Sequence, residues 1–240
     1  MTQPNTPQFN DIGATAPKAH GHFLDSMQLP SGVTRFWLIR HAIVEATARL
    51  RVYGSLDVEL CSEHLALQVP YYTALGRRLP DEANWVVSPL KRAQDTAKAI
   101  FAAGYGARTL TIEPRLTEQS MGEWHNLPHE ELPMKLRQTA HNFWSLSASE
   151  QPPGGESMLD VCARVGHALD EMADHHAGQD TVVVSHGGAI RAALSHALNV
   201  HPDTGLRFSI QNLSLSIIER INGVWRVVTV NELPTAPSVE

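Results

Sequence analysis

Phe36-Trp37-Leu38-Ile39 is a continuous apolar run that leads directly into Arg40 and His41. A run without alternating polar residues is typical of a β-strand that is covered on both faces. Two later runs, Trp85-Val86-Val87 and Val182-Val183-Val184, have the same character, and each precedes a helical pattern. Strands that alternate with helices predict an α/β fold, a three-layer α/β/α sandwich with a mainly parallel central sheet and helices on both faces.

The helical patterns start at recognisable signals. Ser88-Pro89 is expected to supply the cap and first turn of one helix, and a second helix is expected to follow Gly187-Gly188. The clearest helix begins after Ser157, because Asp160 stands three residues later and apolar residues then recur along one stripe. Further elements are expected as follows: a helix over 62–79 that Pro70 kinks or splits, a short strand over 110–112, a helix over 134–146, and a hairpin of strands 213–220 and 224–230 around Asn222-Gly223.

The chain is expected to hold one folded domain. Residues 1–33 are rich in Pro, Gly, Asn, Gln and Thr without periodicity and are predicted to be a tail or arm. Residues 34–232 contain no linker or repeat, and we interpret the irregular stretch 119–156 as a lid inserted into this domain. Residues 233–240 are expected to be a C-terminal tail.

Composition limits the classes of function. The chain has 240 residues, 42% of them hydrophobic and 18% charged, and its two cysteines, Cys61 and Cys162, lack metal or disulfide spacing. Short apolar runs and a start without signal-peptide features predict a cytoplasmic protein with no membrane association. The net charge of -6 argues against nucleic-acid binding, so an anion site, if present, is local.

Chemistry-bearing residues follow all three buried strands. Strand one runs into Arg40-His41, strand two into Ser88 with Arg92 just beyond, and strand three into Ser185-His186-Gly187-Gly188. Ligands of open α/β sheets bind at the carboxyl ends of strands, and arginine forks beside helix N-termini favour a phosphoryl group. The sequence therefore predicts a small phosphorylated ligand at this edge. Surface or packing roles are expected for most other histidines: His20, His22, His64, His129, His141, His167, His175, His176, His196 and His201. No metal site is assigned, because no partner stands at zinc spacing.

Five motifs in order resemble the histidine phosphatase superfamily, in its phosphoglycerate-mutase-like branch. They are Leu38-Ile39-Arg40-His41, the segment from Ser88 to Ala97, Leu116-Thr117-Glu118 with Gly122 and Trp124, Pro153-Gly154-Gly155-Glu156-Ser157, and Val184-Ser185-His186-Gly187-Gly188. The resemblance spans about 35–230. It implies that His41 is a nucleophile that becomes phosphorylated, that Arg40, Arg92 and His186 clamp the phosphoryl oxygens, and that Glu118 is the general acid, with no cofactor. Gly187, Ser88 and Tyr53 join these as candidate substrate-binding residues.

Physical chemistry agrees with these roles. An imidazole attacks phosphorus only when a ring nitrogen is unprotonated, and the charges of Arg40 and Arg92 disfavour the imidazolium form of His41. Glu118 fits a proton donor to the leaving oxygen. Its alternative is a loop carboxylate paired with Arg115 or Arg92.

Two departures from the family pattern affect contacts rather than chemistry. Ala42 stands where the family usually has glycine after Arg-His, which permits a slightly different backbone path. His125-Asn126 replaces Glu-Gly after Trp124, so contacts made by that turn are not transferred.

Three functions remain open at this point. The leading one is a metal-independent phosphomonoesterase that acts through phosphohistidine; the others are a phosphoglycerate mutase and a non-catalytic protein that binds a phosphorylated ligand. Hydrolysis is favoured because Lys91, Arg92, Lys135 and Arg137 are the bases expected near the site, and residues 119–156 lack a mutase-like basic motif. The segment Val52 to Asp57 is similar to that of α-ribazole-phosphatase-like bacterial proteins. Phe143, Trp144 and Leu146 fit a packed lid helix or a homodimer contact equally well.

Overall fold

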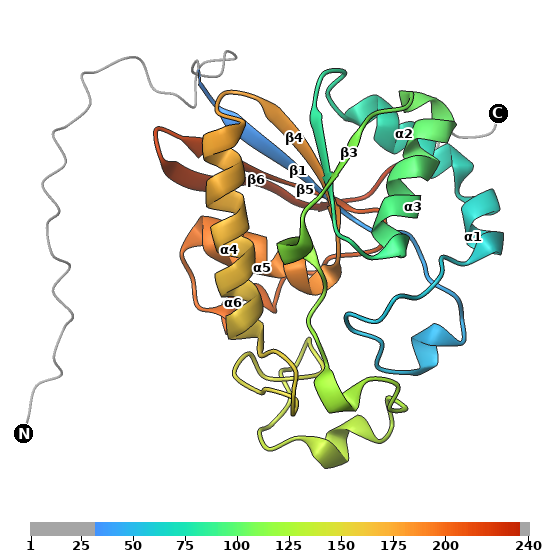
Figure 1. Ribbon diagram of the computed structural model, residues 1–240, viewed down its shortest axis with the longest axis vertical. Helices are drawn as coiled ribbons and strands as arrows, with labels where there is room; N and C mark the ends of the chain where they lie inside the picture. Colours follow the sequence, from blue (N-terminus) through green and yellow to red (C-terminus); the bar gives the residue numbers. More distant parts are fainter. Residues whose placement is uncertain (1–31, 236–240) are drawn as a thin grey trace, which may run out of the picture. The chain divides into compact units, whose positions relative to one another are not determined.

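A six-stranded sheet forms the centre of the fold, with strand order β3-β2-β4-β1-β5-β6 (Figure 1). The computed structural model describes residues 32–235, so the predicted tails 1–33 and 233–240 fall largely outside the described residues. The strands are β1 Thr34–Arg40, β2 Asn84–Val87, β3 Leu110–Ile112, β4 Asp180–Ser185, β5 Leu215–Ile221 and β6 Val224–Glu232.

The sheet is mainly parallel, as the sequence predicted. Strands β3, β2, β4 and β1 run parallel to one another, whereas β5 pairs antiparallel with both β1 and β6. The β5–β6 turn is the expected hairpin, and both Asn222 and Gly223 have the positive φ angles (51° and 80°) that such a two-residue turn requires. Strand β5 begins two residues later than predicted because Leu213 also has a positive φ, 60°, and still belongs to a turn.

Helices cover both faces of the sheet, with α4, α5 and α6 on one face and α1, α2 and α3 on the other (Figure 1). Alternate residues of β1 serve the two layers. Phe36 and Leu38 pack in the same cluster as the apolar stripes of α4 and α5, and Trp37 and Ile39 pack with α2 and α3. The helices are α1 Ser62–Leu67, α2 Val69–Arg78, α3 Lys91–Ile100, α4 Met158–His175, α5 Gly187–Leu198 and α6 Pro202–Gly205. Within the described residues, no helix has the length and apolar character needed to cross a membrane.

Most helix starts follow the sequence signals. Ser157 and Asp160 form a reciprocal capping box at the start of α4, and the 62–79 segment is split at Gln68, two residues before Pro70. The prediction for Ser88-Pro89 is wrong. Leu90 is the N-cap residue of α3, and its apolar side chain makes no cap. The Ser88 hydroxyl, two residues earlier, accepts the Leu90 N–H at 3.3 Å and also bonds to the His186 ring.

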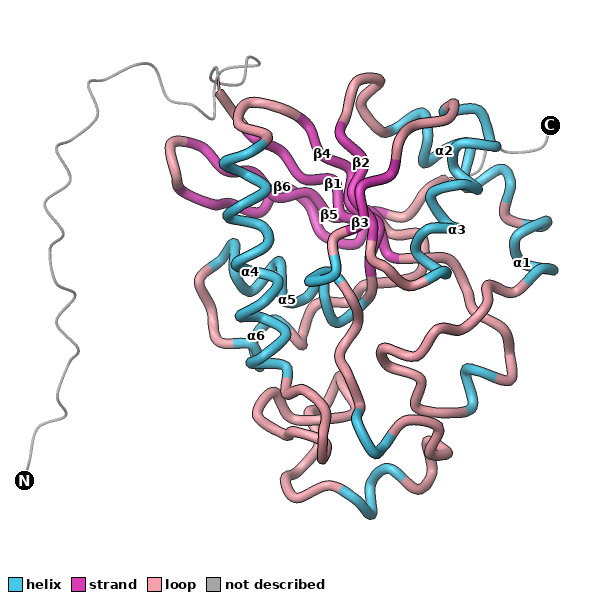
Figure 2. Tube along the Cα trace, viewed as in Figure 1, coloured by secondary structure: helices cyan, strands magenta, loops and turns pink. Residues whose placement is uncertain are grey.

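The predicted helix over 134–146 is also wrong. This part of the lid has one 3₁₀ turn, Leu132–Lys135, and then only bends and turns (Figure 2). The buried carboxylate of Glu150 accepts hydrogen bonds from the backbone N–H groups of Arg137 (3.1 Å) and Gln138 (2.8 Å), which a helix would have directed to its own carbonyls. The lid instead packs around an apolar cluster of its own Met121, Trp124, Leu132 and Leu146 together with Val52 from outside the lid.

Replacing Ser157 with alanine tests the capping box of α4. The Ser157→Ala variant loses the hydroxyl that accepts the Asp160 N–H at 3.2 Å, so we expect its free energy of unfolding to fall by about 1 kcal/mol. Urea denaturation measures this change. Ser149→Ala removes an exposed lid serine and serves as the control, with an expected change within about 0.5 kcal/mol. Equal effects of the two substitutions would contradict the role of the cap.

Candidate active site

Strand register brings the predicted residues to one edge of the sheet. Arg40, the last residue of β1, stands opposite Ser185, the last residue of β4. The His41 N–H donates to the Ser185 carbonyl at 2.9 Å, and the Ser88 N–H donates to the Val184 carbonyl at 3.1 Å. The residues that follow β1, β2 and β4 are therefore level with one another, and they lie beside the start of α5.

His41 is held as a neutral imidazole with a defined tautomer. Its side chain is buried, and Nδ1 donates to the carbonyl of Ala42 at 2.7 Å, which leaves the lone pair on Nε2. Burial, together with the charges of Arg92 and Arg40, holds the pKa of His41 well below its ordinary value. His41 therefore carries an unprotonated Nε2 at neutral pH, which is the form that can attack phosphorus.

His186 is fixed as the opposite tautomer. Arg92 Nε donates to its Nδ1 at 3.2 Å, so the proton of the ring stands on Nε2, which donates to Ser88 Oγ at 2.7 Å. Burial and the neighbouring charge of Arg92 hold the pKa of His186 well below its ordinary value. The two imidazole rings lie 5.2 Å apart, centroid to centroid, so His41 and His186 belong to one cluster.

Arg40 and Arg92 are hydrogen-bonded without a carboxylate partner. Arg92 is fully buried and donates to the carbonyls of Gly54 and Leu56, each at 2.7 Å, while Arg40 Nη1 donates to the carbonyl of Ile210 at 2.6 Å. Neither guanidinium forms an ion pair with a carboxylate of residues 32–235. Because a carbonyl accepts a hydrogen bond without cancelling a charge, an uncompensated positive charge remains beside His41.

Glu118 faces this cluster from the loop that follows the 3₁₀ turn Pro114–Leu116. Its carboxylate accepts the N–H of Gln119 at 2.9 Å and the N–H of Gly188, in the first turn of α5, at 3.0 Å. The alternative pairing with Arg115 is not formed, because Arg115 binds Glu113 and Glu171. A Cβ atom at Gly188 would come within 2.2 Å of the Glu118 carboxylate, so glycine is needed there for this contact.

A cavity of about 290 Å³ opens above these groups. The sequence placed the lid over the site, and the lid does contribute to the lining. It also predicted Lys91, Lys135 and Arg137 as the nearby bases, which is wrong, because none of the three lines the cavity and Lys91 pairs with Glu59. The lining residues are Arg40, His41, Arg49, Val52, Tyr53, Gly54, Glu118, Gln119, Met121, His129, Trp144 and Ser145.

Sequence reasoning missed several of these neighbours. Arg49 was not singled out, and His129 was assigned to the surface or to packing, yet both line the cavity. Arg191 of α5 was also missed. Its buried guanidinium donates to the carbonyls of Gly187 (3.0 Å) and Phe208 (2.9 Å) and lies 4.6 Å from the centre of the Trp144 ring system. Burial and the charge of Arg40 lower the pKa of Arg191 to about 10. The spacing Gly187-x-x-x-Arg191, one helical turn, was the available signal.

The remaining candidates take distinct places. Tyr53 lines the cavity, with its ring 5.3 Å from the Arg92 guanidinium carbon, whereas Ser88 is fully buried and reaches the site through His186. Ala42 is accommodated, since its N–H donates to Thr96 Oγ1 at 2.9 Å. At the second departure from the family pattern, His125-Asn126, His125 Nε2 accepts the Met121 N–H at 3.1 Å. This hydrogen bond stabilises the lid and does not involve the reacting groups.

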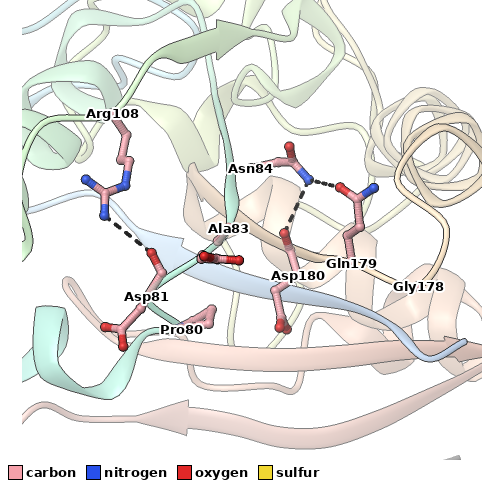
Figure 3. Close-up of a pocket in the computed structure, with 9 residues that line it drawn as sticks. Pro80, Asp81, Ala83, Asn84, Arg108, Gly178, Gln179 and Asp180 are labelled. Carbon is pink, nitrogen blue, oxygen red and sulfur yellow. Dashed lines mark hydrogen bonds between the residues drawn. The ribbon is translucent and has the colours of Figure 1, made fainter. Parts of the chain in front are cut away.

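A second, larger cavity lies at the opposite end of the sheet. Figure 3 shows its lining around Asn84 and Asp180, the first residues of β2 and β4, with Arg108 donating to the Asp81 carbonyl at 3.3 Å. None of the motif residues reaches it. Among residues 32–235, no group of three or more His, Cys, Asp or Glu side chains is placed to hold a metal ion.

Comparisons with known proteins agree with this geometry. The chain is 30% identical over 189 residues to a protein named probable phosphoglycerate mutase GpmB from Yersinia pestis (strain Pestoides F), covering 79% of this chain and 86% of that protein. A mycobacterial glucosyl-3-phosphoglycerate phosphatase has a TM-score of 0.71 at 26% identity, covering 83% of this chain and 99% of the other.

A putative α-ribazole-5'-phosphate phosphatase from Escherichia coli K-12 shares the fold, with a TM-score of 0.68 at 22% identity, covering 83% of this chain and 96% of the other. The sequence profile of the histidine phosphatase superfamily (branch 1) matches residues 36–233. With His41, Arg40, Arg92 and His186 gathered at the sheet edge, and with a family match across the whole described domain, the chain belongs to the histidine phosphatase superfamily, branch 1.

Proposed function

We propose that this protein is a metal-independent phosphomonoesterase that hydrolyses a small phosphorylated metabolite through a phosphohistidine on His41. The observation that carries this proposal is the state of His41. Its Nδ1–H is engaged by Ala42, its pKa is depressed by burial and by two guanidiniums, and it lines a cavity of substrate size. These features support a free Nε2 as the attacking atom.

The proposed reaction has two balanced steps. In the first, His41 Nε2 forms a bond to phosphorus while the ester P–O bond breaks, and Glu118 gives a proton to the leaving oxygen. In the second, water attacks phosphorus, Glu118 takes a proton from that water, and the N–P bond breaks to restore His41. Arg40, Arg92 and His186 stabilise the charge on the transferring group in both steps.

A second candidate is phosphoglycerate mutase activity. The name of the Yersinia relative favours it, and so does Arg49, because the sequence argument against a mutase relied on a shortage of basic residues near the site. A mutase and a phosphatase share the first step and differ in whether an alcohol or water receives the phosphoryl group. Product analysis therefore separates them.

Hydrolysis of p-nitrophenyl phosphate in the presence of EDTA tests the leading function. We expect the wild-type protein to release phosphate, and His41→Ala to fall to the rate of buffer alone, because the variant lacks the proposed nucleophile. His167→Ala removes a surface histidine of α4 and is the matched control, with unchanged activity expected. Circular dichroism verifies that both variants fold.

Three results would overturn the proposal. Full activity in His41→Ala would show that His41 is not the nucleophile. Conversion of 3-phosphoglycerate to 2-phosphoglycerate without net release of phosphate would establish the mutase instead. A protein that cleaves no phosphoester but gains thermal stability in phosphate would be a binding protein.

The role of Glu118 is tested by changing the leaving group. Nitrophenolate leaves without a proton, whereas an alkoxide needs one, so in single-turnover measurements of the first step Glu118→Gln should slow release of glycerol from glycerol 3-phosphate about 10²- to 10⁴-fold and release of nitrophenolate from p-nitrophenyl phosphate far less. Glu123→Gln, at an exposed lid position, is the control. If Glu118→Gln slows this first step equally for both esters, the carboxylate orients the substrate rather than donating a proton to the leaving group.

The neutral histidines predict how stability depends on pH. In the unfolded chain both imidazoles take up a proton near pH 6.5, whereas His41 and His186 stay neutral in the folded protein. The unfolded state then binds more protons, so the stabilisation is complete above about pH 6.5 and is lost as pH falls, by up to about 1.4 kcal/mol per pH unit for each histidine.

Urea denaturation between pH 7.5 and 5.5 measures this slope. We expect His186→Gln to reduce the slope by about one proton relative to wild type. His167→Gln, at the exposed α4 position, should leave the slope unchanged. An undiminished slope in His186→Gln would show that His186 is charged in the folded protein.

A further inference from the structure

The loop before β5, residues 210–214, is hydrogen-bonded to the end of β1. The Arg40 N–H donates to the Ser214 carbonyl at 3.2 Å, and the Leu213 N–H donates to the Arg40 carbonyl at 3.0 Å. The Arg40 side chain also reaches this loop, because its Nη1 donates to the Ile210 carbonyl at 2.6 Å. The loop and the end of β1 therefore form one hydrogen-bonded unit beside the site.

Asn212 is the residue of this loop whose side chain contacts the backbone of His41. Its Nδ2 donates to the His41 carbonyl at 2.8 Å and to the Ala42 carbonyl at 3.2 Å. A side-chain amide carries two N–H hydrogens, so both bonds form at once. The Ala42 carbonyl is also the acceptor of the His41 Nδ1–H at 2.7 Å. Asn212 and the His41 imidazole therefore share one carbonyl oxygen and use both of its lone pairs.

The backbone beside Asn212 has a conformation that leucine rarely adopts. Leu213 has a φ of 60°, in the left-handed region, and its side chain is buried in the cluster that contains Ile39 and Ile217. Such strain persists only where the surrounding contacts hold it, and it is found most often at functional sites. The burial of Leu213 and its hydrogen bond to Arg40 supply those contacts, so the position of Asn212 is fixed by its neighbour.

The direction of the Ala42 carbonyl depends on side chains. Ala42 follows β1 outside any helix or strand, and among residues 32–235 no backbone N–H donates to its carbonyl. The peptide between His41 and Ala42 is held from both sides, because Asn212 binds its carbonyl and Thr96 Oγ1 accepts its N–H at 2.9 Å. Asn212 is the side chain, apart from His41 itself, that holds the next carbonyl in place.

We propose that Asn212 is a positioning residue for the nucleophile. It fixes the Ala42 carbonyl as the acceptor of the His41 Nδ1–H, and this bond keeps Nε2 unprotonated. When Nε2 bonds to phosphorus, the ring gains positive charge, and the same carbonyl stabilises that charge at Nδ1–H. The inference rests on the proposed function, in which His41 attacks the ester. Asn212 does not line the cavity, so it acts through His41 rather than on the substrate.

The tautomer of the His41 ring tests the inference directly. Two-bond ¹H–¹⁵N NMR spectra of the labelled protein distinguish Nδ1–H from Nε2–H, and the signals lost in His41→Gln identify those of His41. We expect the wild-type protein at pH 7.5 to hold His41 as the Nδ1–H tautomer alone. Asn212→Ala should show both tautomers, because the Ala42 carbonyl is no longer held toward Nδ1. Gln211→Ala removes an exposed amide side chain from the same loop and should give the wild-type spectrum.

Kinetics and phosphate binding supply a second readout. In single-turnover reactions with p-nitrophenyl phosphate, Asn212→Ala should release nitrophenolate about 10- to 100-fold more slowly than the wild type, because the attacking nitrogen is misplaced. The dissociation constant of inorganic phosphate, measured by calorimetry, should stay close to that of the wild type, since the proposed phosphate cage is unchanged. Asn212→Asp keeps the size of the side chain but presents no N–H to the two carbonyls, so it should not restore the rate.

Several results would overturn the inference. A pure Nδ1–H tautomer or an unchanged rate in Asn212→Ala would do so, and so would equal effects in Gln211→Ala. A loss of phosphate affinity as large as the loss of rate would show general damage to the site instead of misplacement of His41. If Asn212→Ala fails to fold, as judged by circular dichroism, Asn212→Asp takes its place in the NMR experiment with the same expected mixture of tautomers.

The proposed function fails separately from this inference. A wild-type protein that releases no phosphate from any ester would refute hydrolysis. The tautomer of His41 in the Asn212 variants is measured without substrate, so it would still decide whether Asn212 positions the ring.

Discussion

The guanidiniums of Arg40, Arg92 and Arg191 donate to backbone carbonyls rather than to carboxylates, and the rest of the site depends on that arrangement. Arg40 donates to Ile210, Arg92 to Gly54 and Leu56, and Arg191 to Gly187 and Phe208, in each case to a carbonyl oxygen. These bonds fix the side chains and leave their charge uncancelled. The same charge, together with burial, keeps both imidazoles neutral. A carboxylate in any of these places would have weakened the pull on a phosphoryl group.

The loop of Glu118 is held by groups that come from other elements. Ser185 Oγ, at the end of β4, donates to the Leu116 carbonyl at 2.7 Å. Arg164 of α4 donates to the carbonyl of Thr117 (2.8 Å) and to that of Glu118 (3.3 Å), while Glu156 pairs with its guanidinium. The carboxylate of Glu118 is consequently positioned by both a strand end and a helix. This arrangement explains why Glu156 and Ser157, far along the chain, accompany the motif that contains Glu118.

The parts of the site that the sequence predicted depend on local signals. An apolar run followed by Arg40-His41 or Ser185-His186 marks both a buried strand and its carboxyl end, and the parallel order then places these ends together. The parts it missed depend on distant contacts. Glu150 binds two N–H groups of the expected helix over 134–146, and His186 bonds to Ser88, two residues before the N-cap residue of α3. Neither Glu150 nor His186 is adjacent in sequence to the backbone or side chain that it binds. Periodicity and capping rules consider only neighbouring residues, so they could not predict these contacts.

The position of Arg49 could not be predicted for the same reason. Its segment is joined to the lid by a backbone hydrogen bond between Val52 and Leu127, which are distant in sequence. Its position also bears on how a substrate enters. The Trp144 side of the lid is tied to the core, since Arg191 lies against the Trp144 ring and the Ala148 N–H donates to Asp203 at 3.1 Å. The exposed lining residues are Arg49, His129 and Ser145. Because His41 is buried, these three exposed residues mark the side on which the cavity meets solvent.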